Sequence, residues 1–321
     1  MKYSNSELLK MYGQLYFGRN YELKITEKLA TGKLPGFYHL AVGQEAIQLG
    51  IMNAIGSEDW IVPHPRCHPL FALHCGIKEF TAEMIGKSEG INGGMASYVH
   101  LYVPEKKIGP SNGVMGENQA LGVGIALGYK MDKKKGAVVI GIGDGSFQEG
   151  VVSEVMNMAA IYNLPIVFYI ESNNIAISTP IHGVASRLTK MVEKGKAFGL
   201  EGATYDGNNI IEVRETMEAA LEKARRGEPN IVEYTTTRWR GHFEGDPALY
   251  RDPKVVEEAK KDDPILKYQK YLLENGYATE EQLRAIEKEQ YEIINEAFEY
   301  AMNLPDTTPG NVINPDLVYA K

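Results

Sequence analysis

Two short apolar runs, separated by a segment of helical period, constrain the fold of this 321-residue chain more than any other feature. Residues 137–142 (AVVIGI) and 166–170 (IVFYI) are almost continuously apolar, as expected of strands buried on both faces. Between them, residues 149–162 place Val152, Val155, Met156 and Ala159 on one side of a helix. Two buried strands joined by such a helix form a βαβ unit. The sequence therefore predicts an α/β fold, with a mostly parallel sheet and helices on both faces.

The remaining pattern extends this fold on both sides. Helical spacing predicts helices over 6–29, 116–128, 211–224 and 279–302, another helix opening at 43–45, and a strand over 230–235. Thr279 and Gln282 form a capping-box pair. Three prolines within 57–76 predict a loop or a strand end, and the glycine-rich segment 92–116 predicts irregular backbone. We find no repeat or linker, and we expect one domain over 1–321, with 253–321 as its helical C-terminal extension.

Composition excludes several classes of function. The formal net charge of −8 disfavours nucleic acid as a partner, because an acidic surface repels phosphate backbones. No apolar run approaches the roughly 20 residues that span a bilayer, and the charged first thirty residues do not resemble a signal peptide. With only two cysteines, a disulfide framework is not expected. We expect a cytoplasmic protein that binds neither membrane nor nucleic acid.

A glycine- and acid-containing turn directly follows the first apolar strand, and an asparagine pair follows the second. Gly143-Asp144-Gly145-Ser146 precedes Asn173-Asn174, with 29 residues from Asp144 to Asn173. In open α/β sheets ligands bind outside the carboxyl ends of the strands, where glycines let backbone N–H groups approach a phosphate. Asp144 would repel a bare diphosphate, so a divalent cation between them is expected, and Mg²⁺ prefers such oxygen ligands.

Two other interpretations of these motifs remain open at this point. The first is purely structural: a glycine turn and a surface asparagine pair that bind no ligand. A nicotinamide site fits less well, because the glycines at 141, 143 and 145 give Gly-x-Gly-x-Gly in place of Gly-x-Gly-x-x-Gly.

Several segments in order carry a specific resemblance. Gly-Asp-Gly followed some thirty residues later by Asn-Asn is similar to the signature of thiamine-diphosphate enzymes. Over nearly its whole length the chain resembles the α subunit of the thiamine-dependent first component of 2-oxo acid and acetoin dehydrogenase complexes, and 238–246 (RWRGHFEGD) is most like the acetoin enzymes. The other matching segments are 35–46, 113–116, 143–145, 157–165 and 171–180. The resemblance implies the thiamine-diphosphate-binding fold.

The resemblance also implies roles for individual residues. Asp144 and Asn173 become side-chain Mg²⁺ ligands, and Ile175 supplies a carbonyl ligand. The residues that would bind thiamine diphosphate are Arg66, Gly143, Gly145 and Ser146 at the diphosphate, Gly113 and Met115 at the aminopyrimidine, and Ile177 as the apolar wedge. The alternative is plain core packing for Met115 and Ile177, and solvated surface for Arg66.

Two histidines, His39 and His242, match those that face the reacting centre in the family. Their unperturbed pKa near 6.5 suits proton transfer at neutral pH, although a lone histidine is more often structural. His68 is a weaker candidate, and His64, His74 and His182 are interpreted as bystanders. Residues 63–69 and 92–102 depart from the family pattern and line the expected substrate mouth, which leaves the substrate open.

The resemblance further implies partners and a reaction. A β subunit would supply the activating glutamate in an assembly of two α and two β chains, and a lipoyl-bearing acyltransferase would accept the acyl group. The expected reaction is oxidative C–C cleavage of acetoin or a related substrate. The alternatives are a pyruvate or branched-chain 2-oxo acid dehydrogenase α subunit and a non-catalytic cofactor-binding subunit. Half of a split transketolase is disfavoured, because we find no histidine loop of the Gly-His-Gly type.

Overall fold

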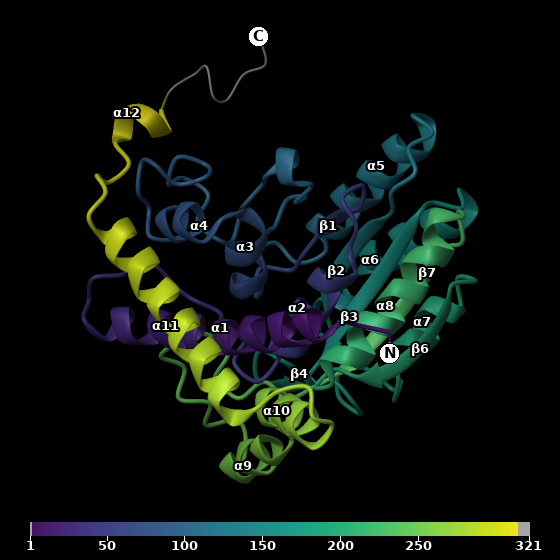
Figure 1. The fold of residues 1–321 in the computed structure, drawn as a ribbon. Helices are drawn as coiled ribbons and strands as arrows, with labels where there is room; N and C mark the ends of the chain where they lie inside the picture. The colour runs from purple at the N-terminus through teal and green to yellow at the C-terminus, as the bar shows by residue number, and fades with distance from the viewer. Residues whose placement is uncertain (1, 314–321) are drawn as a thin grey trace.

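Five parallel strands form the central sheet of the computed structural model, which describes residues 2–313 (Figure 1). Their spatial order is β1-β2-β3-β7-β6. The bounds are β1 (Trp60–Val62), β2 (Val138–Gly143), β3 (Ile166–Ser172), β6 (Glu201–Asp206) and β7 (Asn230–Thr235). β2 and β3 are adjacent and parallel, and α6 (Gly150–Ile161) connects them. The predicted βαβ unit is therefore confirmed.

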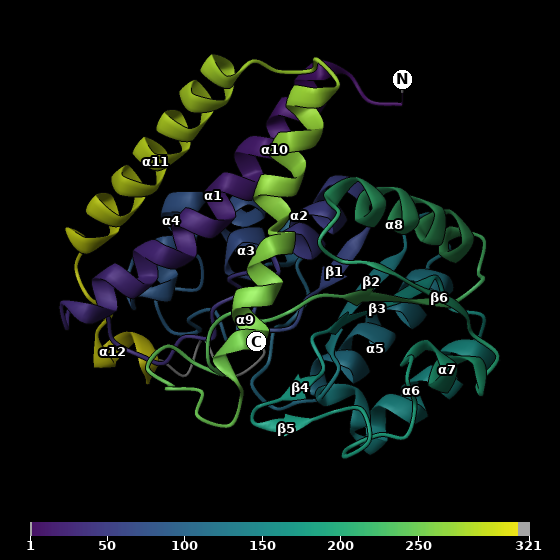
Figure 2. The same ribbon diagram turned by 90° about the horizontal axis from the view of Figure 1, so that it is seen from below.

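Helices cover both faces of this sheet. α5 (Glu117–Met131), α6 and α7 (Val192–Lys196) lie on one face, and α2 (Glu45–Ala54) and α8 (Ile210–Arg225) lie on the other (Figure 2). Successive β2 side chains enter different hydrophobic cores: Val138 and Ile140 pack on the α5–α6 side, and Val139 packs on the α8 side. The continuous apolar run thus reflects burial on both faces, and the predicted α/β fold is confirmed.

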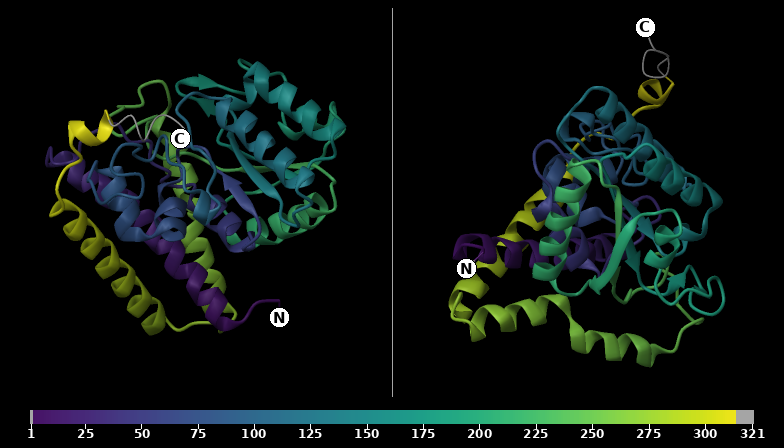
Figure 3. Two further views of the ribbon diagram at one scale, coloured as in Figure 1. Left: turned by 90° about the horizontal axis from the view of Figure 1, so that it is seen from above. Right: turned by 90° about the vertical axis from the view of Figure 1, so that its right-hand side faces the viewer.

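The rest of the described chain is largely helical. These helices are α1 (Asn5–Ala30), α3 (His68–Cys75), α4 (Ile77–Met84), α9 (Pro253–Ala259), α10 (Pro264–Glu274), α11 (Glu280–Met302) and α12 (Pro309–Val312), with 3₁₀ turns at Pro104–Lys106, Ser146–Gln148 and Lys260–Asp262. α11 packs against α1 and α4 (Figure 3). Thr279 and Gln282 form both bonds of the predicted capping box. The helical C-terminal region is confirmed. Residues 314–321 of the expected extension lie outside the described residues, and the single-domain assignment stays a prediction.

The proline-broken segment 57–76 is more regular than we predicted. It contains β1, and it contains α3, which includes Pro69 in its first turn. Proline is tolerated there because the first N–H groups of a helix have no intrahelical partner. β6 and α7 were also not predicted, since their apolar spacing is short or interrupted by charges, whereas α9 and α10 lie within the helical extension predicted for 253–321. No helix among residues 2–313 is both long and apolar enough to cross a membrane.

The irregular segment after α4 is organised by one buried carboxylate. Glu83 accepts backbone N–H bonds from Asn92, Gly94 and Ala96, each at 2.7 Å, and from Ser97 at 3.0 Å. Four charge-assisted bonds to one side chain replace the regular backbone pairing that this glycine-rich stretch lacks. Glu83 therefore fixes the backbone that leads into Tyr98.

Candidate active site

The residues that we predicted as a site follow the carboxyl ends of neighbouring strands. Arg66 follows β1, Asp144 follows β2, Asn173 follows β3, and His242 lies in the segment after β7. Because these strands are parallel, their carboxyl ends meet at one edge of the sheet. The hairpin β4 (Ile175–Ala176) and β5 (Thr179–Pro180) continues from the end of β3 at this edge (Figure 2).

Asp144 has one carboxylate oxygen without a partner. Its side chain is 2% exposed, and its Oδ1 accepts the N–H of Gly145 at 2.8 Å. Its Oδ2 is buried and has no hydrogen-bond partner. Burial raises the pKa of this carboxyl to about 6, although the backbone N–H groups of Asn174, Gly145 and Asn173 oppose that rise. A buried acceptor of this kind is costly unless a cation or donor reaches it.

The side chain of Asn173 is held in one orientation. Its Nδ2 donates to Gln44 Oε1 at 2.8 Å, and its Oδ1 accepts the N–H of Ile175 at 3.2 Å. The next residue, Asn174, has a left-handed φ of 61°, and its Oδ1 accepts the N–H of His182 at 3.0 Å. Asn174 thus shapes the hairpin, while the Asn173 amide oxygen bonds the first residue of β4.

Two guanidinium groups at this edge lack a carboxylate partner. Arg66 donates to the carbonyl oxygens of Leu40 at 2.7 Å and His242 at 2.8 Å. Arg238, which is 2% exposed, donates to the Ile177 carbonyl at 3.0 Å. Within residues 2–313 neither group forms an ion pair. Burial, followed by repulsion from Arg238, lowers the pKa of Arg66 to about 10. Desolvated cations of this kind favour an anionic ligand.

His39 and His242 lie face to edge, with ring centroids 4.7 Å apart. His39 Nδ1 is 2.8 Å from the hydroxyl of Tyr98, which in turn donates to the Phe37 carbonyl at 2.5 Å. Burial and the charge of Arg66 lower the pKa of His39 to about 3 and that of His242 to about 4. Both rings are therefore neutral at neutral pH.

The loop that carries His242 is fixed by Asp246. The Asp246 Oδ2 accepts the backbone N–H of His242 and the hydroxyl of Tyr250, each at 2.6 Å. These bonds hold the pKa of Asp246 at about 2, so that its carboxyl is ionised at any physiological pH. The His242 backbone is thus anchored independently of its ring.

The other predicted cofactor residues form the glycine turn and two exposed loops. Ser146 Oγ donates to the Gly143 carbonyl at 2.9 Å, which closes the turn after β2. A Cβ on Gly145 would lie 2.7 Å from Ala176, so the turn and the hairpin approach too closely for a side chain. Ile177 is 59% exposed and has a φ of 53°, a strained conformation for a β-branched residue.

Gly113 and Met115 lie in the loop before α5. A Cβ on Gly113 would lie 2.9 Å from Val99, so this loop packs against segment 92–102. Met115 is 39% exposed, and Ile177 is more exposed still. Neither side chain is therefore packed in a core, which was the alternative that we considered for Met115 and Ile177.

Comparison with known proteins decides the family. The sequence model of the family described as "Dehydrogenase E1 component" matches residues 14–310. The chain belongs to the dehydrogenase E1 component family. The pyruvate dehydrogenase E1 component subunit alpha of Rhizobium meliloti is 31% identical over 95% of this chain and 88% of its own length. The corresponding subunit of Rickettsia bellii is 33% identical over 93% of this chain and 92% of its own length. The alpha subunit of acetoin:2,6-dichlorophenolindophenol oxidoreductase from Bacillus subtilis is 33% identical over 94% of this chain and 91% of its own length.

Sequence reasoning missed a buried network behind the site of this E1 chain. Glu171 Oε1 accepts from Gln44 Nε2 at 2.6 Å, and Oε2 lies 3.2 Å from Nε2 of His64. Since Gln44 also holds Asn173, this network orients a predicted metal ligand. Gln44 lies within the matching segment 35–46, and Arg238 opens the segment 238–246. Tyr98 had no comparable signal, because its contact with His39 is purely tertiary.

The residues at the strand ends fit a cation and a diphosphate. No group of three or more histidine, cysteine or acidic side chains that could hold a metal occurs among residues 2–313. The predicted site uses one carboxylate, one amide oxygen and one carbonyl, so it needs phosphate or water oxygens to complete an octahedron. The unpartnered Asp144 oxygen is free to bind a cation, and the two guanidiniums without carboxylate partners are suited to hold the phosphate that would complete its coordination.

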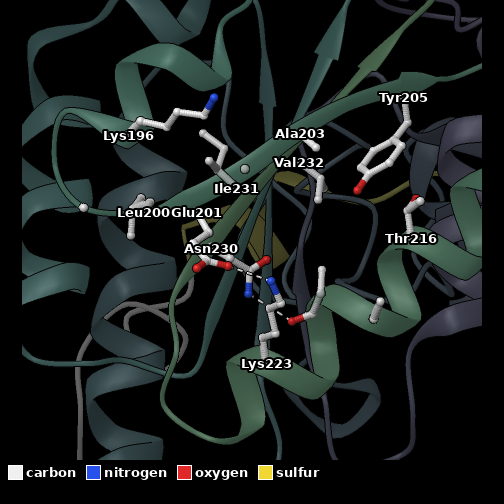
Figure 4. Close-up of a pocket in the computed structure, with 14 residues that line it drawn as sticks. Lys196, Leu200, Glu201, Ala203, Tyr205, Thr216, Lys223, Asn230, Ile231 and Val232 are labelled. Atoms are coloured by element: carbon white, nitrogen blue, oxygen red, sulfur yellow. Dashed lines mark hydrogen bonds and ion pairs between the residues drawn. The ribbon is translucent and has the colours of Figure 1, made fainter.

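A hollow of about 510 Å³ lies elsewhere, between β6, β7 and α8 (Figure 4). Its polar groups are paired locally: Lys223 contacts Glu201, and Asn230 donates to the Ala220 carbonyl. This hollow contains no predicted site residue.

Proposed function

We propose that this chain is the α subunit of a thiamine-diphosphate- and Mg²⁺-dependent oxidoreductase that cleaves a C–C bond of acetoin or a related 2-oxo or hydroxyketone substrate. One observation carries the proposal: an unpartnered buried carboxylate oxygen on Asp144 lies at the same sheet edge as Arg66 and Arg238, whose guanidiniums lack carboxylate partners. Members of the dehydrogenase E1 family use thiamine diphosphate, which supports this ligand.

Each proposed cofactor contact belongs to a named residue. Asp144 and Asn173 would bind Mg²⁺ through side-chain oxygens, and Ile175 would bind it through its carbonyl. The diphosphate would be held by Arg66 and Ser146 and by the turn at 143–145, and the thiazolium and pyrimidine by Gly113, Met115 and Ile177. The bound cofactor would supply the nucleophilic carbon of the reaction, while this chain would bind and orient the cofactor.

The two histidines would move protons at the reacting centre. The Tyr98 hydroxyl donates to a carbonyl, so it accepts from His39, which assigns the proton to Nδ1 and leaves Nε2 as a base. His242 lies against this ring on a loop fixed by Asp246. Neutral imidazoles can accept a proton from a substrate hydroxyl and return it to a developing oxyanion.

A β subunit would complete the site. The relatives are named as alpha subunits, which supports a β partner for this chain. Exposed apolar residues around the site, Val114 at 63% and Ile177 at 59%, are suited to burial by a partner. We further propose two α and two β chains, transfer of the acyl group to a lipoyl-bearing acyltransferase, and a cytoplasmic location.

A second candidate is pyruvate or a branched-chain 2-oxo acid as substrate. Several relatives are pyruvate dehydrogenase alpha subunits, which favours pyruvate over a branched-chain acid. Acetoin, by contrast, is supported by the segment 238–246 and by the relative from Bacillus subtilis.

The deciding experiment reconstitutes the chain with its β subunit and compares acetoin, pyruvate and a branched-chain 2-oxo acid, with an artificial electron acceptor. A kcat/KM for acetoin at least about tenfold above the others supports the proposal, and the reverse order supports the second candidate. If calorimetry detects cofactor binding with Mg²⁺ but no substrate turns over, a non-catalytic subunit is indicated. If thiamine diphosphate does not bind even with Mg²⁺ and the β subunit, the proposal is wrong.

A further inference from the structure

A fully buried histidine–carboxylate pair, His68 and Glu22, lies next to Tyr98, the residue that contacts His39. His68 is the first residue of α3, and Glu22 lies in the second half of α1; both side chains have no exposed surface. The Nδ1 of His68 is 3.1 and 3.0 Å from the two carboxylate oxygens of Glu22. The other ring nitrogen, Nε2, is buried and has no hydrogen-bond partner.

The carboxylate determines which nitrogen of His68 holds a proton. An ionised carboxylate can only accept, so the ring nitrogen facing it must donate. Nδ1 therefore keeps its proton, and Nε2 is the only position at which this ring can gain or lose one. A carboxylate in this place fixes both the tautomer and the orientation of an imidazole.

His68 lies against the residues that hold His39. Its ring packs edge to face on Tyr98, with centroids 4.3 Å apart, and the Tyr98 hydroxyl is the group 2.8 Å from His39 Nδ1. Glu22 also accepts the backbone N–H of Ala41 at 3.0 Å, two residues beyond His39. One carboxylate on α1 thus ties together α3 and the segment that carries His39.

Several titratable groups surround the pair of Glu22 and His68. The basic ones are Arg66 and His39, and the tyrosines are Tyr21, Tyr38 and Tyr98. A second carboxylate, Glu171, acts on Arg66 together with Glu22. Glu22 is the carboxylate that bonds the His68 ring, so its loss would remove both the acceptor of that ring and a negative charge from beside the site.

We propose that Glu22 is a positioning residue of the active site, which holds His68 with Nδ1 protonated and Nε2 free and anchors the backbone beside His39. This inference rests on the proposed function for its catalytic meaning, but the tautomer of His68 can be measured without it. The contacts are specific: one carboxylate accepts from the His68 ring and from the Ala41 backbone.

The first measurement is the ¹⁵N spectrum of the histidine rings in the full chain, with the His68 signals assigned by their loss in His68→Gln. At neutral pH we expect Nδ1 of His68 to show the signal of a protonated nitrogen. In Glu22→Gln the amide offers a donor as well as an acceptor, so the Nδ1 signal should shift toward that of an unprotonated nitrogen. An unchanged Nδ1 signal in Glu22→Gln overturns the inference.

The second measurement uses the reconstituted complex. In Glu22→Gln we expect kcat to fall by about 10- to 100-fold with a displaced pH profile, while the affinity for thiamine diphosphate changes less than about threefold. Glu22→Asp, which keeps the charge, should restore part of the rate and the original profile. Glu233→Gln is the matched control: Glu233 is 1% exposed and accepts from Met191 N–H and Thr204 Oγ1, each at 2.9 Å, so this variant removes a buried, hydrogen-bonded carboxylate that does not contact the site histidines.

The two measurements separate the failures. A loss of rate in Glu22→Gln without a displaced profile, matched by Glu233→Gln, means that Glu22 is merely structural and contradicts the inference. If the wild-type complex turns over no substrate, the proposed function fails, and the ring spectra still decide whether Glu22 sets the tautomer of His68.

Discussion

The rings of His39 and His242 meet edge to face with their centroids 4.7 Å apart, although 203 positions separate them in the chain. They come from the segment before α2 and from the loop after β7. Arg66 links them, because it donates to the carbonyls of Leu40 and His242. The following predictions test this arrangement and the strand-end turn beside it.

The two histidines should make the free chain less stable in acid. Their pKa values in the fold, about 3 and about 4, lie below the ordinary value near 6.5. The unfolded chain therefore binds more protons between these values, and the free energy of unfolding falls as the pH drops through that window. At pH 5 a fully buried histidine would lose about 2 kcal/mol, and the loss is smaller for each of these two rings because both are partly solvent-accessible.

Urea unfolding at pH 7 and pH 5 measures this loss. The double variant His39→Gln/His242→Gln should lose less stability over this interval than the wild type, because neither glutamine titrates. Equal losses in the two proteins would show that these histidines are not held neutral by the fold.

Asp144 should make cation binding dependent on pH. The pKa of its carboxyl is raised to about 6, so at pH 5 a proton occupies the proposed metal ligand. Since the metal must displace that proton, the apparent Mg²⁺ affinity in the presence of thiamine diphosphate should fall about tenfold between pH 7 and pH 5. Calorimetric titration at the two pH values measures the change.

Asp144→Asn should abolish the Mg²⁺ dependence at both pH values. Asp252→Asn is the control, because Asp252 only caps α9 by accepting the N–H of Lys254. If Asp144→Asn retains Mg²⁺-dependent binding of the cofactor, the cation is held elsewhere.

Removing the ring of His242 should impair turnover more than binding. Its backbone N–H and carbonyl make the contacts with Asp246 and Arg66, and these survive in His242→Ala. We expect kcat of the reconstituted complex to fall by about 100-fold or more, with cofactor affinity changed only a few-fold. His74→Ala is the control, since His74 contacts the Lys106 carbonyl on the surface. A wild-type rate in His242→Ala would leave this chain with a binding role only.

Glu83→Gln should destabilise the segment that leads to Tyr98. The NH₂ group of the glutamine would face backbone N–H groups that now bond a carboxylate oxygen, and two donors cannot pair. Leaving buried donors unpaired costs roughly 1–3 kcal/mol each. We expect the free energy of unfolding to fall by at least about 2 kcal/mol. Protease cleavage within 90–102 should become faster. Glu89→Gln is the control, because Glu89 bonds only the exposed hydroxyl of Tyr300. Equal stability of the two variants would contradict the role that we assign to Glu83.

The sequence determined the three middle strands of the central sheet, β2, β3 and β7, and the turn that follows β2. Apolar runs, helical period and glycines are local signals, so β2, α6 and β3 could be predicted closely, and with them the neighbouring positions of Asp144 and Asn173. The capping box at Thr279 was also readable, because its two partners are three residues apart.

Only the tertiary structure decided the rest of the site. That Tyr98 holds His39, that Arg66 contacts His242, and that Glu22 pairs with His68 depend on how α1, α3 and the loop after β7 pack around the sheet. No local pattern encodes these contacts. The physical reason is that backbone conformation follows from neighbours in the chain, whereas burial, charge pairing and the pKa of a side chain follow from groups that folding brings together from distant segments.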